Sequence, residues 1–222
     1  MKLKTFNPIW EEIFKSRNWG KYPPEELIRF IAINFYKVSD RREIRILDLG
    51  CGTGACTWFI AREGFSTYGI DGSKTAIEIN RNRLDLENLK AELIVNDIAH
   101  MPWQNDYFDA VIDVDCLQCN NCKDSQIIID EIYRVLKPKG KHFSITAKRG
   151  CWGDKTGTII DNYTYKNVTE GPFSDMGTIR FSTKSNIKKM YQKFYNLSFE
   201  CSIRTMNDCQ KKIAHWIFSC QK

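Results

Sequence analysis

Short apolar runs alternate with amphipathic segments over most of this chain. Five apolar runs bounded by polar or glycine-containing turns predict buried strands, at 44–49, 67–71, 91–95, 108–113 and 141–147. The segments between them carry apolar residues at helical spacing, as over 126–136. This alternation predicts a mainly parallel sheet covered by helices. Two last apolar segments, 197–205 and 211–220, predict an antiparallel hairpin.

Three glycines at every second position follow the first of these strands. Gly50, Gly52 and Gly54 come two residues after an acid, Asp48, and just before an amphipathic segment. Glycine allows a positive φ and lets a ligand approach the backbone closely. The helix that follows would direct its free N–H groups into the same space. The stretch therefore predicts a ligand site, with a purely structural turn as the alternative.

The nonamer Ile46–Gly54, an apolar strand ending in Asp-Leu-Gly-Cys-Gly-Thr-Gly, resembles motif I of the class I S-adenosylmethionine-dependent methyltransferases. The resemblance covers about 44–148 by motif and 183–220 by pattern. Residues 134–140 resemble the family's turn before its fifth strand, with Lys139 where glycine is usual. The resemblance implies a Rossmann-like α/β fold: a seven-stranded, mostly parallel sheet with a C-terminal antiparallel hairpin and helices on both faces. It also implies S-adenosylmethionine as cofactor and S-adenosylhomocysteine as product.

Acidic residues at the predicted strand ends are the main candidates for holding that cofactor. Asp71 follows the second strand, where a carboxylate can accept hydrogen bonds from both ribose hydroxyls; capping the next helix is its alternative role. The resemblance assigns the adenine to the Asp97 carboxylate and the Ile98 N–H. Asp113 and Asp115 are candidates for the cofactor's amine or an incoming substrate, or are solvated loop acids. The cofactor-binding residues expected are Asp48, Gly50, Cys51, Gly52, Gly54, Asp71, Gly72, Ser73, Asn96, Asp97, Ile98, Asp113 and Asp115.

Residues 1–40 are aromatic-rich, and the prolines before Glu25 predict a helix start. In similar methyltransferases an N-terminal helical segment often closes over the cofactor. The resemblance therefore makes Trp19 and Tyr22 candidate lid residues, and packing of the N-terminal helices is the alternative.

Residues 150–182 interrupt the alternation of strands and helices with glycine, threonine and aromatic residues. A long insertion at this sheet edge usually serves binding. We expect Lys148, Arg149 and Trp152 to face the acceptor, which favours an acidic, phosphate-bearing or sugar-like molecule. In the alternative, both cations face solvent.

Three cysteines, Cys116, Cys119 and Cys122, form a C-x2-C-x2-C run, which begins like an iron–sulfur ligand set. The fourth cysteine and its proline are missing, and no further ligand follows at zinc-site spacing. We therefore expect no metal. The nine cysteines of the chain are an odd number scattered through apparent core segments, which favours free thiols in a reducing compartment.

The 222 residues are 42% hydrophobic with a formal net charge of +6, which fits one domain over 1–222 and does not require nucleic acid. No apolar run approaches the roughly 18 residues of a membrane helix, and the N-terminus lacks the apolar core of a signal peptide. These features predict a cytoplasmic protein with a small-molecule partner and no membrane contact.

The predicted function is methyl transfer to an oxygen or nitrogen of a small-molecule metabolite. The alternatives are a nucleic-acid or protein methyltransferase and a non-catalytic cofactor-binding module. Asp113-Val114-Asp115-Cys116 lacks the Pro-Pro-aromatic sequence of adenine N-methylation, and the chain has no Pro-Cys pair for cytosine C5 chemistry. The sequence assigns no general base, acceptor identity or oligomeric state.

Overall fold

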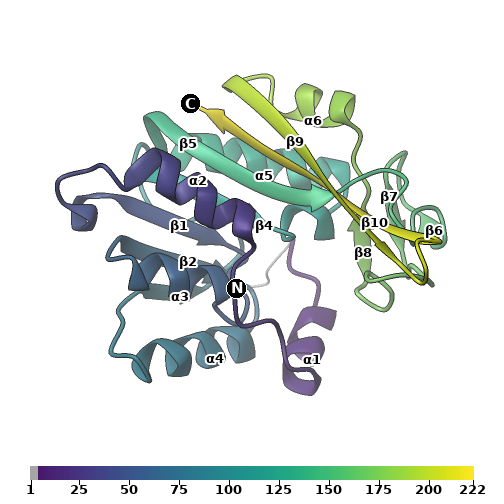
Figure 1. Ribbon diagram of the computed structural model, residues 1–222, viewed down its shortest axis with the longest axis horizontal. Helices are drawn as coiled ribbons and strands as arrows, with labels where there is room; N and C mark the ends of the chain where they lie inside the picture. The colour runs from purple at the N-terminus through teal and green to yellow at the C-terminus, as the bar shows by residue number, and fades with distance from the viewer. Residues whose placement is uncertain (1–4) are drawn as a thin grey trace.

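A seven-stranded sheet forms the centre of the computed structural model, which describes residues 5–222 (Figure 1). Its order is β3-β2-β1-β4-β5-β10-β9. The first five strands pair in parallel, and β10 runs antiparallel to both of its neighbours. The strands are β1 Arg45–Leu49, β2 Ser66–Asp71, β3 Glu92–Val95, β4 Phe108–Val114, β5 Leu136–Ala147, β9 Tyr195–Met206 and β10 Lys211–Gln221. The predicted fold class is confirmed. Four residues of the predicted N-terminal segment 1–40 lie outside the described part.

Six α-helices and two 3-10 turns connect these strands within residues 5–222. They are α1 Ile9–Ser16, α2 Glu25–Phe35, α3 Ala55–Arg62, α4 Lys74–Asp85, α5 Cys122–Val135, α6 Lys184–Met190, η1 Arg41–Glu43 and η2 Leu117–Cys119. Helix α2 begins after Pro24, as predicted. Helix α5 begins four residues before the predicted 126, because the Asn121 side chain accepts a hydrogen bond from the Asp124 N–H and caps it there.

Successive side chains of the central strands contribute to two apolar layers, one on each face of the sheet. Ile46 of β1 packs with α2 and α3, whereas the next residue, Leu47, packs with α5 and α6 on the opposite face. Successive side chains of a strand point to opposite faces, so a central strand covered on both sides must be apolar throughout. In Figure 1, α2 crosses the front of the sheet and α5 lies behind it.

The chain leaves β1 toward β2 and β3, then returns to continue with β4 and β5 on the other side. This change of direction lies between β1 and β4, and ligands of open α/β sheets bind at such a point, beyond the carboxyl ends of the strands. The glycine turn, Asp71, Asn96 and Asp115 all lie at that edge, because each follows or ends one of these parallel strands.

The insertion forms a small sheet of its own, which the sequence pattern did not predict. Its strands are β6 Thr158–Ile159, β7 Thr164–Lys166 and β8 Thr178–Arg180. It lies beside the turn that joins β9 to β10 in Figure 1 and shares an apolar cluster with β10. The insertion thereby becomes part of the wall at the ligand-binding edge.

Arg180 ties this insertion to the loop after β4. Its side chain is 3% exposed. It donates hydrogen bonds to the backbone oxygens of Leu117 and Asn120, each at 3.3 Å, and to Ser182 Oγ at 2.7 Å. Burial lowers the pKa of its guanidinium from the usual value. The position of the η2 loop therefore depends in part on this side chain, together with the Ser125 hydroxyl, which donates to the same two carbonyls at 3.3 Å.

Replacing this arginine tests that dependence. Arg180→Met keeps an extended apolar stem but removes the hydrogen bonds to both carbonyls and to Ser182, so we expect the free energy of unfolding to fall by about 1–3 kcal/mol in urea denaturation. Lys166→Ala, on the exposed face of β7, is the matched control and should change it by less than about 0.5 kcal/mol. Equal stability of Arg180→Met and the unsubstituted protein would contradict the assignment.

Candidate functional site

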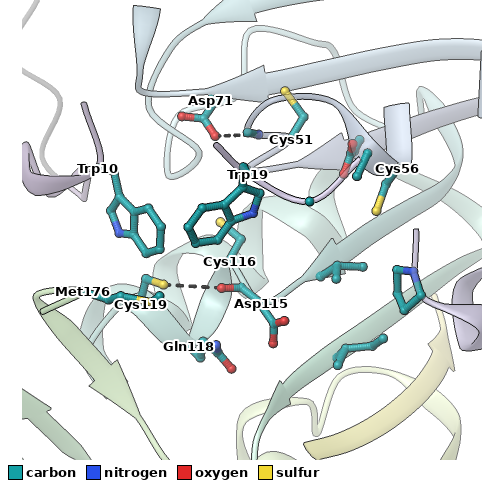
Figure 2. A pocket seen from close by; sticks show the side chains of 18 of the residues that line it. Trp10, Trp19, Cys51, Cys56, Asp71, Asp115, Cys116, Gln118, Cys119 and Met176 are labelled. Atoms are coloured by element: carbon teal, nitrogen blue, oxygen red, sulfur yellow. Dashed lines mark hydrogen bonds between the residues drawn. The ribbon is translucent and has the colours of Figure 1, made fainter. Parts of the chain in front are cut away.

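A cavity of about 660 Å³ lies at the carboxyl edge of the parallel strands (Figure 2). Its lining comes from four parts of the chain: the glycine turn and strand ends, the N-terminal segment with α1, the insertion, and the hairpin β9–β10. In Figure 2 the rings of Trp10 and Trp19 lie between Asp71 at the top of the view and Asp115 and Gln118 at the bottom. One cavity thus spans the predicted cofactor site and a recess beyond it.

The glycine turn packs so tightly that two of its glycines, Gly50 and Gly54, leave no room for a side chain. Gly50, Gly52 and Gly54 all have positive φ. A Cβ at Gly50 would overlap the thiol of Cys116, and one at Gly54 would overlap the side chain of Asn80. The turn can therefore lie against the loop after β4 and expose its backbone to the cavity only with glycine at these positions.

Asp71 at the end of β2 joins the glycine turn to α4. Its two carboxylate oxygens accept hydrogen bonds from the Gly52 N–H at 2.9 Å and the Ser73 N–H at 2.8 Å. Burial raises the pKa of this carboxyl above its usual value, and these backbone donors oppose the rise. Each oxygen accepts more than one hydrogen bond, so the carboxylate, which lines the cavity, can also receive a sugar hydroxyl.

The N-terminal segment is anchored along the edge predicted to hold the nucleoside. The Thr5 hydroxyl and N–H donate to the Asp97 carboxylate. A Cβ at Gly72 would overlap the Phe6 ring. Glu11 of α1 accepts from the hydroxyl of Ser73 at 2.5 Å. Residues 5–11 therefore cover this edge directly.

Aromatic residues of the same segment form one wall of the cavity. The rings of Trp10, Phe14 and Trp19 lie 5.7 Å apart, centroid to centroid, in each of the three pairs. Trp19 and Tyr22, the predicted lid residues, both line the cavity. Such a wall can exclude water from a bound ligand.

Three further acids lie at the base of the site in different environments. Asp48 accepts from the Thr57 hydroxyl at 2.6 Å, and burial raises the pKa of its carboxyl to about 7. Asp113 is fully buried and accepts from the Leu117 N–H at 2.9 Å and the Ser144 hydroxyl at 2.6 Å, so it holds the η2 loop in place. Partial burial, aided by the negative charge of Asp113, raises the pKa of Asp115 above its usual value.

Nine of the thirteen residues predicted to bind the cofactor line the cavity: Asp48, Gly50, Cys51, Gly52, Asp71, Gly72, Asn96, Ile98 and Asp115. The other four, Gly54, Ser73, Asp97 and Asp113, lie next to it. Gly54 and Ser73 are the N-caps of α3 and α4. The binding roles of the set stay predictions.

The structure corrects the placement expected for the basic residues after β5. Lys148, Arg149 and Trp152 are not among the residues that line the cavity. The Lys148 ammonium lies over the Trp216 ring, Arg149 pairs with Asp154 at 3.2 Å, and the Trp152 N–H donates to Glu170. Backbone pairing of Lys148 with β10 and with Ser182 draws this segment alongside the hairpin instead of over the site.

Other cavity residues carried no recognised sequence motif. Phe173, Met176 and Ile179 come from the insertion, and Ile213 and His215 come from β10. Only His215 left a signal in the sequence, because it interrupts an apolar row of alternate residues along the last strand.

The cysteine run does not gather into one site. Cys116 packs under Gly50, the Cys119 thiol donates to the Asp115 backbone oxygen, and the Cys122 N–H donates to Asp161. All nine cysteines of the chain are free thiols. Over residues 5–222, no group of three metal-binding side chains is placed to hold an ion.

Comparison with known proteins gives matches to methyltransferases. Residues 46–140 match the family model of a methyltransferase domain. The demethylmenaquinone methyltransferase of Tropheryma whipplei is 38% identical over 97 residues, which are 43% of this chain and 38% of that protein. The ubiquinone biosynthesis O-methyltransferase of Coxiella burnetii is 26% identical over 67% of each chain. The chain thus spans about two fifths of the length of the first of these relatives.

Solved structures share the fold. A SAM-dependent methyltransferase from Methanosarcina mazei has a TM-score of 0.67 and 21% identity, over 86% of this chain and 96% of that one. A magnesium protoporphyrin IX methyltransferase from Synechocystis with bound SAM has a TM-score of 0.61 and 12% identity, over 89% and 77% of the two chains. In the described part of this chain, no helix has the length and apolar character needed to cross a membrane.

The buried acid Asp48 predicts a pH-dependent stability. A carboxyl whose pKa is about 7 in the folded state and near 3.8 when unfolded stabilises the fold while protonated. That contribution is complete below about pH 4 and is lost as the pH rises through about 7. An asparagine at position 48 does not ionise, so Asp48→Asn should become more stable relative to the unsubstituted protein as the pH rises from 5 to 8. One pKa unit corresponds to about 1.4 kcal/mol, so the gain should exceed about 1 kcal/mol in urea denaturation. The exposed Asp85→Asn should show no such trend.

Proposed function

We propose that this chain, which belongs to the class I S-adenosylmethionine-dependent methyltransferases, transfers a methyl group from S-adenosylmethionine to an oxygen or nitrogen of a small-molecule metabolite. The observation that carries this proposal is the continuity of the cavity. It runs from the glycine turn and Asp71 to an apolar recess beneath the insertion. Cofactor and acceptor can therefore lie end to end, as an in-line displacement requires.

Residues at one end of the cavity fit the cofactor's chemistry. Asp71 and the glycine turn offer a carboxylate and exposed backbone to the nucleoside end, next to Asn96 and Ile98. Asp48 and Asp115 line the same cavity and favour a ligand with positive charge when they are ionised. S-adenosylmethionine, when bound, supplies an activated methyl group on a cationic sulfur, which is already a good leaving group. The protein's own task is then alignment and exclusion of water.

The N-terminal segment supports an enclosed reaction. Thr5 and Glu11 anchor it along the nucleoside edge, and Trp10, Phe14 and Trp19 wall the cavity. We propose that residues 1–40 act as the lid and residues 150–182 as the acceptor side of a single domain over 1–222. A cavity closed in this way suits a small acceptor better than a nucleic acid or a protein surface.

The recess favours an apolar acceptor. Phe173, Met176, Ile179, Ile213 and Ile217 supply its apolar side chains, and the polar side chains of the same cavity include Gln118, Asn120, Ser202, Arg204 and His215. The hypothesis of an acidic or phosphate-bearing acceptor depended on Lys148 and Arg149, neither of which lines the cavity. One relative is an O-methyltransferase of ubiquinone biosynthesis, which agrees with a largely apolar acceptor and methylation at oxygen.

Cofactor binding gives the direct test. S-adenosylhomocysteine should raise the melting temperature increasingly with its concentration, because it binds the native state, and NAD should not. Asp71→Ala should weaken that binding about 10- to 100-fold in calorimetry, which corresponds to about 1–3 kcal/mol for an unpaired polar group.

Asp85→Ala is the matched control, since this exposed acid at the far end of α4 lies outside the cavity. It should bind S-adenosylhomocysteine as the unsubstituted protein does. Stabilisation by NAD alone would refute the cofactor assignment, and unchanged affinity in a folded Asp71→Ala would reduce Asp71 to a structural link between the glycine turn and α4.

A further inference from the structure

One polar side chain interrupts the apolar row that β10 presents to the cavity. Ile213, His215 and Ile217 line it, whereas the intervening Ala214 and Trp216 do not. Alternate residues of a strand share a face, so His215 stands between two aliphatic residues on the side of β10 that faces the cavity. The histidine is 21% exposed in its side chain. An accessible imidazole in an apolar recess calls for a chemical role.

Strand pairing brings this histidine to the acid at the end of β4. His215 lies opposite Ala147 of β5, and the Asp115 N–H donates to the oxygen of Ile145 on the same strand. As a result, Nε2 of His215 lies 3.8 Å from Oδ1 of Asp115. That oxygen is buried and has no hydrogen-bond partner among the described residues. Asp115 also has a φ of 61°, a conformation few non-glycine residues adopt.

The groups around the imidazole leave it neutral and ready to accept a proton. Burial lowers the pKa of His215 below its usual value, Glu26 of α2 opposes this, and Arg204 of β9 adds to it. Ser202 pairs with His215 across the hairpin. The Phe173 ring meets the imidazole edge to face at 6.0 Å between centroids. The imidazole therefore faces one acid, two other charges and an aromatic wall.

We propose that His215 is the general base for a hydroxyl acceptor, with Asp115 as the residue that positions and charge-stabilises it. This inference rests on the proposed function and narrows it to O-methylation of an apolar, aromatic hydroxyl compound. The acceptor O–H loses its proton to the imidazole of His215, at the ring nitrogen opposite the one that faces Asp115, as its oxygen forms the new bond to carbon. The carbon–sulfur bond breaks, and its electron pair stays on the sulfur. The Asp115 carboxylate then faces an imidazolium.

The residue types favour this acceptor over an amine. An amine must only be presented neutral, whereas a hydroxyl becomes a strong nucleophile when a base removes its proton. Phe173 offers an aromatic face beside the imidazole, and Met176 and Ile179 continue the apolar wall. A flat aromatic hydroxyl satisfies both the base and the wall.

The first arm of the test measures the histidine itself. The chain has three histidines, so His215→Asn assigns the His215 signal in an NMR titration of the full chain with S-adenosylhomocysteine. Asp115→Asn should lower the pKa of His215, because an ionised carboxylate 3.8 Å from Nε2 favours the imidazolium. Arg204→Gln should raise it. An unchanged value in Asp115→Asn overturns the pairing.

The second arm uses 4-nitrophenol, whose phenolate absorbs visible light. With S-adenosylhomocysteine present, the phenol should ionise at a pH about one unit lower on the unsubstituted protein than on His215→Asn, because the proton moves to the imidazole. Arg204→Gln controls for simple attraction of the phenolate by a cation and should keep most of the shift. No shift, no binding of the phenol, or loss of the shift only in Arg204→Gln each overturn the proposal.

Calorimetry with S-adenosylhomocysteine separates this inference from the proposed function. Neither His215→Asn nor Asp115→Asn changes the glycine turn or Asp71. The affinity of His215→Asn for S-adenosylhomocysteine should therefore stay within about twofold of that of the unsubstituted protein. If no form binds S-adenosylhomocysteine, the proposed function fails. If all forms bind it and the two other arms show no effect, only the role of His215 fails.

Discussion

The buried carboxylate of Asp113 fixes the turn on which both halves of the site depend. It accepts hydrogen bonds from the N–H groups of Cys116 and Leu117 and from the Ser144 hydroxyl. Burial raises its pKa to about 6. These donors close the chain into η2 directly after β4, and the position of η2 determines what lies on either side of it.

On one side of that turn lies the glycine loop. Cys116 occupies the space in which a Cβ at Gly50 would stand, so the loop after β4 by itself requires glycine at this position. On the other side, Arg180 binds the backbone oxygens of Leu117 and Asn120 and brings the insertion over the recess. The cofactor end and the acceptor end are therefore built on one loop, and a disturbance of it should reach both.

The cofactor half of the site was predictable because its constraints act on the backbone. Positive φ and close packing require glycine at Gly50 and Gly54, and the end of a strand places Asp71, so sequence order alone indicates the site. The usual glycine at position 139 is explained in the same terms, since Lys139 adopts a φ of 66° there. By contrast, the strands β6 to β8 span two or three residues each, too few for an alternating pattern to appear.

The acceptor half depends on long-range pairing that no local pattern records. Asp115, Phe173 and His215 come from a strand end, an insertion and the last strand, and they meet because β10 runs antiparallel between β5 and β9. The same pairing draws Lys148 onto Trp216 and away from the cavity, which is why proximity in sequence to the end of β5 was misleading. A polar residue in an inward apolar row is the one trace that such a site leaves in the sequence. Burial of a polar side chain among apolar residues is unfavourable unless it has a polar partner, and His215 has Asp115 3.8 Å away, which is why it, and not the cations after β5, carries our proposal for the chemistry of this recess.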